Sequence, residues 1–207
     1  MPPRPVTPGR LPQMLADLIA AAGAGRLRVA VDGAPAAGTA ELADRLVDLL
    51  RAGGRPGVRV RAPDFLRPAS VRLEHGHEDP QSYRSGWLDY AALRREVLDP
   101  FAASGRYLPT LWDGARDRAT RATPVLTAPG TVLLLDGSLL LGSGLPFDLS
   151  VHLRLGVVAL ARRTEPVLRW TLPAYAGYDG EQLADVVVHA DDPRHPAVAF
   201  SRLLSRP

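Results

Sequence analysis

The strongest constraint on the fold lies in residues 27–51, which read LRVAVDGAPAAGTAELADRLVDLLR. A short apolar run ends at Asp32, a turn is bounded by Gly33 and Gly38, and leucines then recur on one face of a helical repeat. The apolar run is too short for a helix and predicts a buried strand. A second predicted strand, over 57–62, follows the helix after a pair of glycines. This order predicts a right-handed βαβ unit with a ligand crevice at the carboxyl ends of its strands.

The rest of the chain continues the alternation of extended and helical patterns. We expect helices over 11–22, 39–52, 83–101 and 156–163, and strands over 28–31, 57–62, 107–112, 131–135, 151–155 and 184–189. Five or six strands that alternate with helices predict a doubly wound parallel sheet of the α/β class. With 207 residues, 46% of them hydrophobic, we expect a single domain over 11–207 after a flexible arm over 1–10.

The composition argues against several classes of function. The chain has no Cys, which rules out disulfides, thiol nucleophiles and thiolate metal sites. The formal net charge is only +3 and no five-residue basic block occurs, so we expect no nucleic-acid partner. No apolar run approaches the roughly 18 residues that cross a bilayer, and the N-terminal residues do not resemble a signal peptide. We therefore expect no membrane contact and a cytoplasmic protein, for which a homo-oligomer stays open.

The turn after the first strand has the spacing of a phosphate-binding loop, GxxxxGK[ST], without the side chains of that loop. Gly33 and Gly38 keep the spacing, whereas Thr39 stands at the lysine position and Ala40 at the hydroxyl position. All 25 basic residues are Arg, so no lysine elsewhere in the chain can replace the missing one. The glycines therefore either keep a backbone anion site or only make a tight turn.

Four segments, taken together, resemble the uridine kinase family of P-loop nucleoside kinases, in particular the bacterial type with a DDFHRP motif. They are PDFLRP at 63–68, EDPQSYRSGWLDYAALRREVLDPF at 78–101, VLLLDG at 132–137 and ADVVVHADDP at 184–193. The resemblance implies a P-loop NTPase-like, three-layer α/β/α fold. It also implies a nucleoside-side insertion over about 63–125, a shortened lid over about 162–182, and ATP and Mg²⁺ as cofactors.

The departures from the family pattern fall on the chemistry, which puts the use of ATP and Mg²⁺ in doubt. The resemblance places the family's catalytic, metal-linked Asp at Pro63 and its His at Leu66, and Asp64 follows one residue late. Removing one preorganised charge typically slows a reaction by about 10²- to 10³-fold. The contacts that the resemblance still carries over are lid arginines and an aromatic–Asp pair, namely Arg162, Arg169, Trp112 and Asp113.

The candidate site residues fall into three groups. Catalytic candidates are acids and histidines expected near the crevice: Asp64, His75, His77, Glu78 and Asp136. Cofactor-binding candidates are Gly33, Gly38, Thr39, Arg162 and Arg169. Substrate-binding candidates are Asp32, Asp79, Tyr83, Trp87, Trp112 and Asp113. No metal ligand is assigned.

Several of these residues have an alternative interpretation. Asp136 follows an apolar strand and either holds Mg²⁺ or caps the adjacent turn. His75 and His77 belong either to a metal or acid–base cluster or to a solvated loop. The aromatic residues within 83–90 line a pocket or pack in the core. His152, on a buried strand, is expected to be a hydrogen-bonded core residue.

Three functions are compatible with this sequence. The first is a uridine kinase-like protein that has lost ATP-dependent phosphotransfer, binds a small molecule in the old crevice, and can transform it by acid–base chemistry. The second is an active uridine or nucleoside kinase with displaced catalytic groups. The third is a non-catalytic pseudokinase that serves as an interaction partner.

Overall fold

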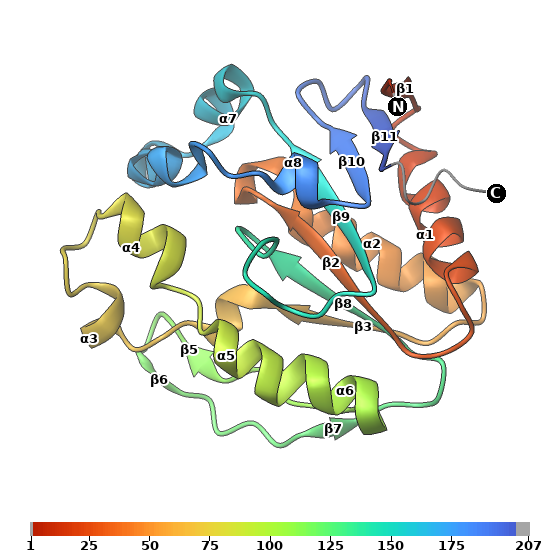
Figure 1. Ribbon diagram of the computed structural model, residues 1–207, viewed down its shortest axis with the longest axis horizontal. Coiled ribbons are helices and arrows are strands. Elements are labelled where there is room, and N and C mark those ends of the chain that lie inside the picture. Colours follow the sequence, from red (N-terminus) through yellow and green to blue (C-terminus); the bar gives the residue numbers. More distant parts are fainter. Residues whose placement is uncertain (1, 202–207) are drawn as a thin grey trace.

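Seven strands form the central sheet of the computed structural model, which describes residues 2–201 (Figure 1). They are β1 (Arg4–Pro5), β2 (Leu27–Gly33), β3 (Gly57–Arg61), β8 (Val132–Gly137), β9 (Leu149–Arg154), β10 (Val186–His189) and β11 (Ala197–Phe200). Their order is β1-β11-β10-β9-β2-β8-β3. The five strands from β10 to β3 are parallel, whereas β11 and β1 add an antiparallel edge. The predicted doubly wound sheet is confirmed as a mostly parallel one.

The middle strands β2 and β8 are buried on both faces, as their continuous apolar sequences require. Val31 lies opposite Asp136 and Asp32 lies opposite Gly137 in their parallel register. The two carboxylates therefore come to neighbouring positions at the carboxyl ends of adjacent strands. This is the edge of an open parallel sheet where ligands usually bind.

Helices cover both faces of the sheet and its carboxyl edge. They are α1 (Leu11–Ala21), α2 (Thr39–Ala52), α3 (Ala69–Arg72), α4 (Pro80–Ser85), α5 (Tyr90–Ala92), the π-helical segment η3 (Leu93–Leu98), α6 (Asp99–Ser104), α7 (Val157–Arg163) and α8 (Gly180–Leu183). Three segments are 3₁₀-helical: η1 (Pro35–Ala37), η2 (Ala62–Phe65) and η4 (Pro166–Tyr175). Within residues 2–201, none of the helices has the length and apolar content to cross a bilayer.

The two larger hydrophobic cores lie on opposite faces of the sheet. On one face α1 and α2 pack against alternate residues of the central strands, for example Leu46 against Val29 and Leu134. On the other face the continuous stretch α5-η3-α6 packs through Leu93 and Phe101. This is the three-layer α/β/α arrangement, and Figure 1 shows α3, α4 and α7 beyond the carboxyl ends of the strands.

The structure differs from the predicted elements in four places. The helix predicted over 83–101 is interrupted at 86–89, between α4 and α5. Arg4–Pro5 pairs with β11, so part of the predicted flexible arm is an edge strand. The strand predicted over 107–112 is replaced by two separate two-residue ladders: β4 (Arg106–Tyr107) with β7 (Val125–Leu126), and β5 (Trp112–Asp113) with β6 (Arg118–Ala119). The antiparallel strand β11 had no predicted counterpart, because four alternating residues carry little periodic signal.

Candidate functional site

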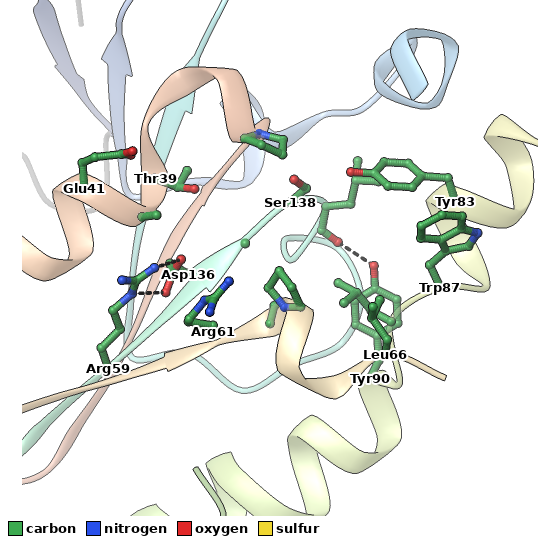
Figure 2. Close-up of a pocket in the computed structure, with 17 residues that line it drawn as sticks. Thr39, Glu41, Arg59, Arg61, Leu66, Tyr83, Trp87, Tyr90, Asp136 and Ser138 are labelled. Atoms are coloured by element: carbon green, nitrogen blue, oxygen red, sulfur yellow. Dashed lines mark hydrogen bonds and ion pairs between the residues drawn. The ribbon is translucent and has the colours of Figure 1, made fainter. Parts of the chain in front are cut away.

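A cavity of about 420 Å³ lies at the carboxyl ends of β3 and β8, beside the first turn of α2 (Figure 2). One end is polar and is lined by Thr39, Glu41, Arg59, Arg61, Asp136 and Ser138. The other end is apolar and aromatic and is lined by Leu66, Tyr83, Trp87, Leu88, Tyr90 and Leu139. The cavity can therefore hold a molecule that has one polar side and one flat or apolar side.

The polar end is dominated by an ion pair between neighbouring strands. Arg59 donates from Nε to Asp136 Oδ1 at 2.6 Å and from Nη2 to Oδ2 at 2.8 Å (Figure 2). The Arg59 Nη1 atom lies 2.7 Å from Asp44 Oδ2. The hydrogen bond to Asp136 raises the pKa of Arg59, so the guanidinium stays charged. Both oxygens of Asp136 are thus taken by one cation. Asp136 in this arrangement does not fit the Mg²⁺ ligand that the family resemblance implies.

The loop between β2 and α2 is tightened by hydrogen bonds of its own. Residues Pro35–Ala37 form η1, where the Ala37 N–H donates to the Ala34 carbonyl at 2.8 Å and the Gly38 N–H to the Pro35 carbonyl at 3.1 Å. Pro35 has no N–H to offer. The backbone donors that would cradle a phosphate are therefore reduced in number.

An acidic side chain stands where the loop meets the cavity. Glu41 lies in the first turn of α2 and lines the cavity, and Figure 2 shows it next to Thr39. A helix N-terminus attracts anions, and a carboxylate there already satisfies that attraction. Glu41 therefore disfavours a phosphate in the place that a phosphate-binding loop would give it.

The two loop glycines have clear conformational roles. Gly38 has φ 84° at the start of α2, a left-handed conformation that glycine adopts without strain. At Gly33 an added Cβ would lie 2.8 Å from the Leu153 carbonyl oxygen. Both glycines are thus explained by the strand-to-helix turn alone.

An aromatic cluster packs η4 against α4. Tyr83 of α4 and Trp87, which follows α4, meet Trp170 and Tyr175 of η4, with ring centroids 5.4–6.3 Å apart. The Tyr83 and Tyr175 hydroxyls are 3.2 Å apart, and Arg84 donates to the carbonyls that follow η4. A second cavity of about 220 Å³ lies between η4 and the loop that joins β2 to α2. The rings of Tyr83, Trp87, Trp170 and Tyr175 therefore form part of the wall of this second cavity.

Asp32 forms a buried hydrogen-bond network and does not line the 420 Å³ cavity. Its Oδ1 accepts the Leu140 N–H at 2.9 Å, and its Oδ2 lies 2.6 Å from His152 Nδ1 and 2.8 Å from the Tyr178 hydroxyl that donates to it. The structure therefore places Asp32, a predicted substrate contact, in the buried interior and away from the cavity. The prediction that His152 is a hydrogen-bonded core residue is confirmed.

Four other predicted catalytic or substrate residues lie outside the cavity. His75, His77 and Glu78 are exposed in the loop before α4, and no cluster of three metal-ligating side chains exists within residues 2–201. Asp79 is the N-cap of α4 and accepts the Ser82 N–H at 2.6 Å. The composition of this loop suggested a metal or acid–base cluster. The two histidines and Glu78 are instead exposed to solvent, and Asp79 caps a helix.

Asp64 also lies outside the cavity, although its neighbours Pro63 and Leu66 line it. Its carboxylate faces Arg61 at 3.9 Å. Burial raises the pKa of Asp64, an effect that Arg61 opposes. Asp64 lies in the 3₁₀ segment η2 and not on an extended segment, and its side chain does not line the cavity.

The last two predicted pairs belong to surface structure. Trp112 donates from Nε1 to Asp117 at 3.0 Å, and Asp113 accepts the Ala115 and Arg116 N–H groups in the same hairpin turn. Arg162 and Arg169 are exposed and line neither the 420 Å³ nor the 220 Å³ cavity. Of the predicted cofactor and substrate residues, the larger cavity collects Thr39, Tyr83 and Trp87.

The sequence interpretation missed both arginines of the polar end. Arg59 and Arg61 alternate with Val58 and Val60 in the strand GVRVR, so they share the opposite face. The alternation of Val and Arg in this strand was the one feature of the sequence that could have indicated these two arginines as site residues. It could not name Asp136 as a partner, because that residue is 77 positions away.

Three solved structures resemble the chain. A possible uridine kinase from Bacillus stearothermophilus has a TM-score of 0.68 at 22% identity and is covered over 96% of its length by 85% of this chain. A candidate fructose transport system kinase from a Silicibacter species has a TM-score of 0.60 at 25% identity, with 85% of this chain and 91% of that one covered. The YGR205w protein has a TM-score of 0.61 at 12% identity, with 94% and 97% covered.

The other comparisons find nothing. No protein-family model matches the chain, and no curated protein matches it. The likeness therefore rests on structure. It shows that the chain has the three-layer fold of uridine kinase-like and sugar kinase-like P-loop kinases.

Proposed function

We propose that this chain is a uridine kinase-like protein that binds a small, uncharged, flat molecule in the 420 Å³ cavity and does not transfer phosphate from ATP. The fold neighbours support a nucleoside or sugar kinase-like ancestry. The residues of the loop and the polar end support the loss of phosphotransfer.

The observation that carries the proposal is the state of the phosphate-binding loop. A triphosphate needs cations and free backbone donors around its oxygens. Here two loop N–H groups bond within the loop, Pro35 offers none, and Glu41 brings a negative charge to the first turn of α2. Bringing ATP to this loop would place like charges together and leave its phosphates with few backbone donors.

The charges around the polar end favour an uncharged occupant. Two positive and two negative side chains line the cavity: Arg59, Arg61, Glu41 and Asp136. Asp44 and Asp64 stand behind the two arginines and add two further negative charges. A polyanion gains little from such a wall, whereas a neutral molecule can hydrogen-bond to it without a net electrostatic cost.

The aromatic end favours a flat ring. Trp87, Tyr83 and Tyr90 line it, and the Tyr90 hydroxyl donates to the Leu139 carbonyl at 3.0 Å, which fixes the orientation of that ring (Figure 2). Stacked or edge-on aromatic contacts add about 0.5–1.5 kcal/mol beyond the area they bury. A nucleoside-like molecule without phosphate matches both ends of the cavity.

Thermal unfolding in the presence of candidate ligands tests the proposal. Uridine and cytidine are expected to raise the melting temperature, because they bind the native state, whereas ATP or ADP with Mg²⁺ is expected to leave it unchanged. Trp87→Ala should abolish the nucleoside shift. Trp112→Ala is the matched control, since Trp112 lies in a hairpin outside the cavity.

A direct assay of phosphate transfer completes the test. The purified protein should form no uridine or cytidine monophosphate from ATP and Mg²⁺ above the background of the buffer. Turnover at about 1 s⁻¹ or faster, within the usual range of enzymes, would overturn the proposal.

A further inference from the structure

Arg59, one of the two arginines at the polar end of the cavity, occupies the position where a divalent cation would bind the neighbouring carboxylates. Arg59 and Asp136 come from adjacent strands, β3 and β8, and Asp44 comes from α2 on the same face of the sheet. Three elements thus converge on one guanidinium. Asp136 is almost fully buried, with 5% of its side chain exposed, and Arg59 has 16% exposed.

The Arg59 guanidinium contacts the carboxylates of Asp136 and Asp44 in the way that a bound cation would. The two hydrogen bonds to Asp136 form the parallel pair in which guanidinium and carboxylate match best, and a third donor reaches Asp44. The positive charge lies 2.6–2.8 Å from three carboxylate oxygens. A divalent ion bound by the same acids would need the space and the lone pairs that Arg59 uses.

We infer that Arg59 permanently takes the place of the divalent cation of this site and makes ligand binding in the 420 Å³ cavity independent of metal. Guanidinium has five N–H donors, of which these contacts use three. Arg59 lines the cavity, so the two remaining donors are available to acceptor atoms of a bound molecule. This inference rests on the proposed function and adds that a ligand carbonyl or hydroxyl is recognised by Arg59 rather than by a bound ion.

If Arg59 takes the place of a divalent cation, removing its side chain should create a metal site. This can be measured without knowing the ligand. Removing the side chain of Arg59 leaves the carboxylates of Asp136 and Asp44 facing one gap without a cation. Two convergent carboxylates and water are a usual ligand set for Mg²⁺ or Mn²⁺. Arg59→Ala should therefore create a divalent-cation site that the wild-type protein lacks.

Mn²⁺ alone is the probe for this experiment. The melting temperature of Arg59→Ala is compared in EDTA and in Mn²⁺, and bound Mn²⁺ is counted by electron paramagnetic resonance. For metal at about 100 times its Kd we expect a rise on the order of 5 °C in Arg59→Ala. The wild type should show no rise and no bound Mn²⁺.

Two control variants locate the effect. Arg61→Ala removes the same charge from the same cavity but leaves the Arg59–Asp136 pair intact, so it should gain no Mn²⁺ site. Asp136→Asn combined with Arg59→Ala should abolish the gain. Arg59→Ser, which removes the guanidinium and leaves space for water between the two carboxylates, serves as the second variant if Arg59→Ala does not fold, and should also gain Mn²⁺ binding.

Two results would overturn the inference. One is Mn²⁺ binding by the wild type that Asp136→Asn abolishes, and the other is the absence of any Mn²⁺ gain in both Arg59 variants. Neither depends on phosphate transfer. Phosphotransfer by the wild type would instead contradict the proposed function, so the two failures are distinguishable.

Discussion

Asp32 and Asp136 lie at the carboxyl ends of adjacent strands, and their different partners give them different roles. Asp32 is fully buried and accepts from a backbone N–H, a hydroxyl and an imidazole. Asp136 is almost as buried, but its partner is an arginine that also lines the cavity. Both acids occupy equivalent positions on the sheet. The hydrogen-bond donors around each acid determine whether it stabilises the fold or forms part of the cavity wall.

The partners of Asp32 come from three separate parts of the chain. His152 belongs to β9, Leu140 to the turn after β8, and Tyr178 to the loop after η4. The carboxylate therefore ties the loop after η4 and the turn after β8 to the middle of the sheet. Asp136 joins fewer elements, and its charge faces a cavity that water can enter.

The largest effect is expected for Asp32→Ala. The change leaves a buried imidazole, hydroxyl and N–H without their acceptor, which should lower the free energy of unfolding by about 4 kcal/mol. Urea unfolding followed by circular dichroism measures it. A loss below about 1 kcal/mol would mean that Asp32 is not the structural member of the pair.

The second effect is expected for Asp136→Ala, at about 1–2 kcal/mol. Arg59 keeps Asp44 as a partner, and water from the cavity can reach the donors that Asp136 leaves free. The same urea unfolding gives the number. If Asp136→Ala costs as much as Asp32→Ala, the contrast between the two acids is wrong.

A third prediction isolates the contribution of one of the three hydrogen-bond partners of Asp32, the Tyr178 hydroxyl. Tyr178→Phe removes the hydroxyl that donates to Asp32 at 2.8 Å and accepts the Leu141 N–H at 3.0 Å. It should cost about 1–1.5 kcal/mol, since the other two partners of Asp32 remain. Tyr107→Phe is the matched control and should be nearly neutral, because within residues 2–201 the Tyr107 hydroxyl has no hydrogen-bond partner.

The local part of this arrangement could be predicted from the sequence. The helix predicted over 39–52 is observed with the same bounds as α2, and both acids stand at strand ends as their apolar runs indicated. Periodicity and glycine positions act over a few residues, so one sequence is enough to read them.

The partners of the two acids could not be predicted in this way. Asp32 and His152 are 120 positions apart, and Asp136 and Arg59 are 77 apart. Such contacts depend on strand order and register, which one sequence does not determine. The loop around His75 shows the opposite error, since ligand-like residues close in sequence remain exposed.

The smallest effect concerns a third acid, Asp148, which is a control for charge pairing away from the cavity. Asp148 accepts two hydrogen bonds from the Arg28 guanidinium and one from the Arg28 N–H. Burial raises the pKa of Asp148, but the contacts with Arg28 outweigh it and leave the pKa below its usual value. The pair therefore stabilises the protein above about pH 3.9, the usual pKa of an unfolded Asp.

Because the folded pKa of Asp148 is the lower one, its contribution is lost as the pH falls below that value through the folded pKa. Asp148→Asn should lower the free energy of unfolding at pH 7 by less than about 1 kcal/mol, as expected for a partly exposed pair. The difference between wild type and variant should shrink toward pH 2. A difference that instead grew on acidification would show that Asp148 acts through its packing. Asp136 also accepts two hydrogen bonds from one arginine, so its contribution would then also have to be assigned to packing.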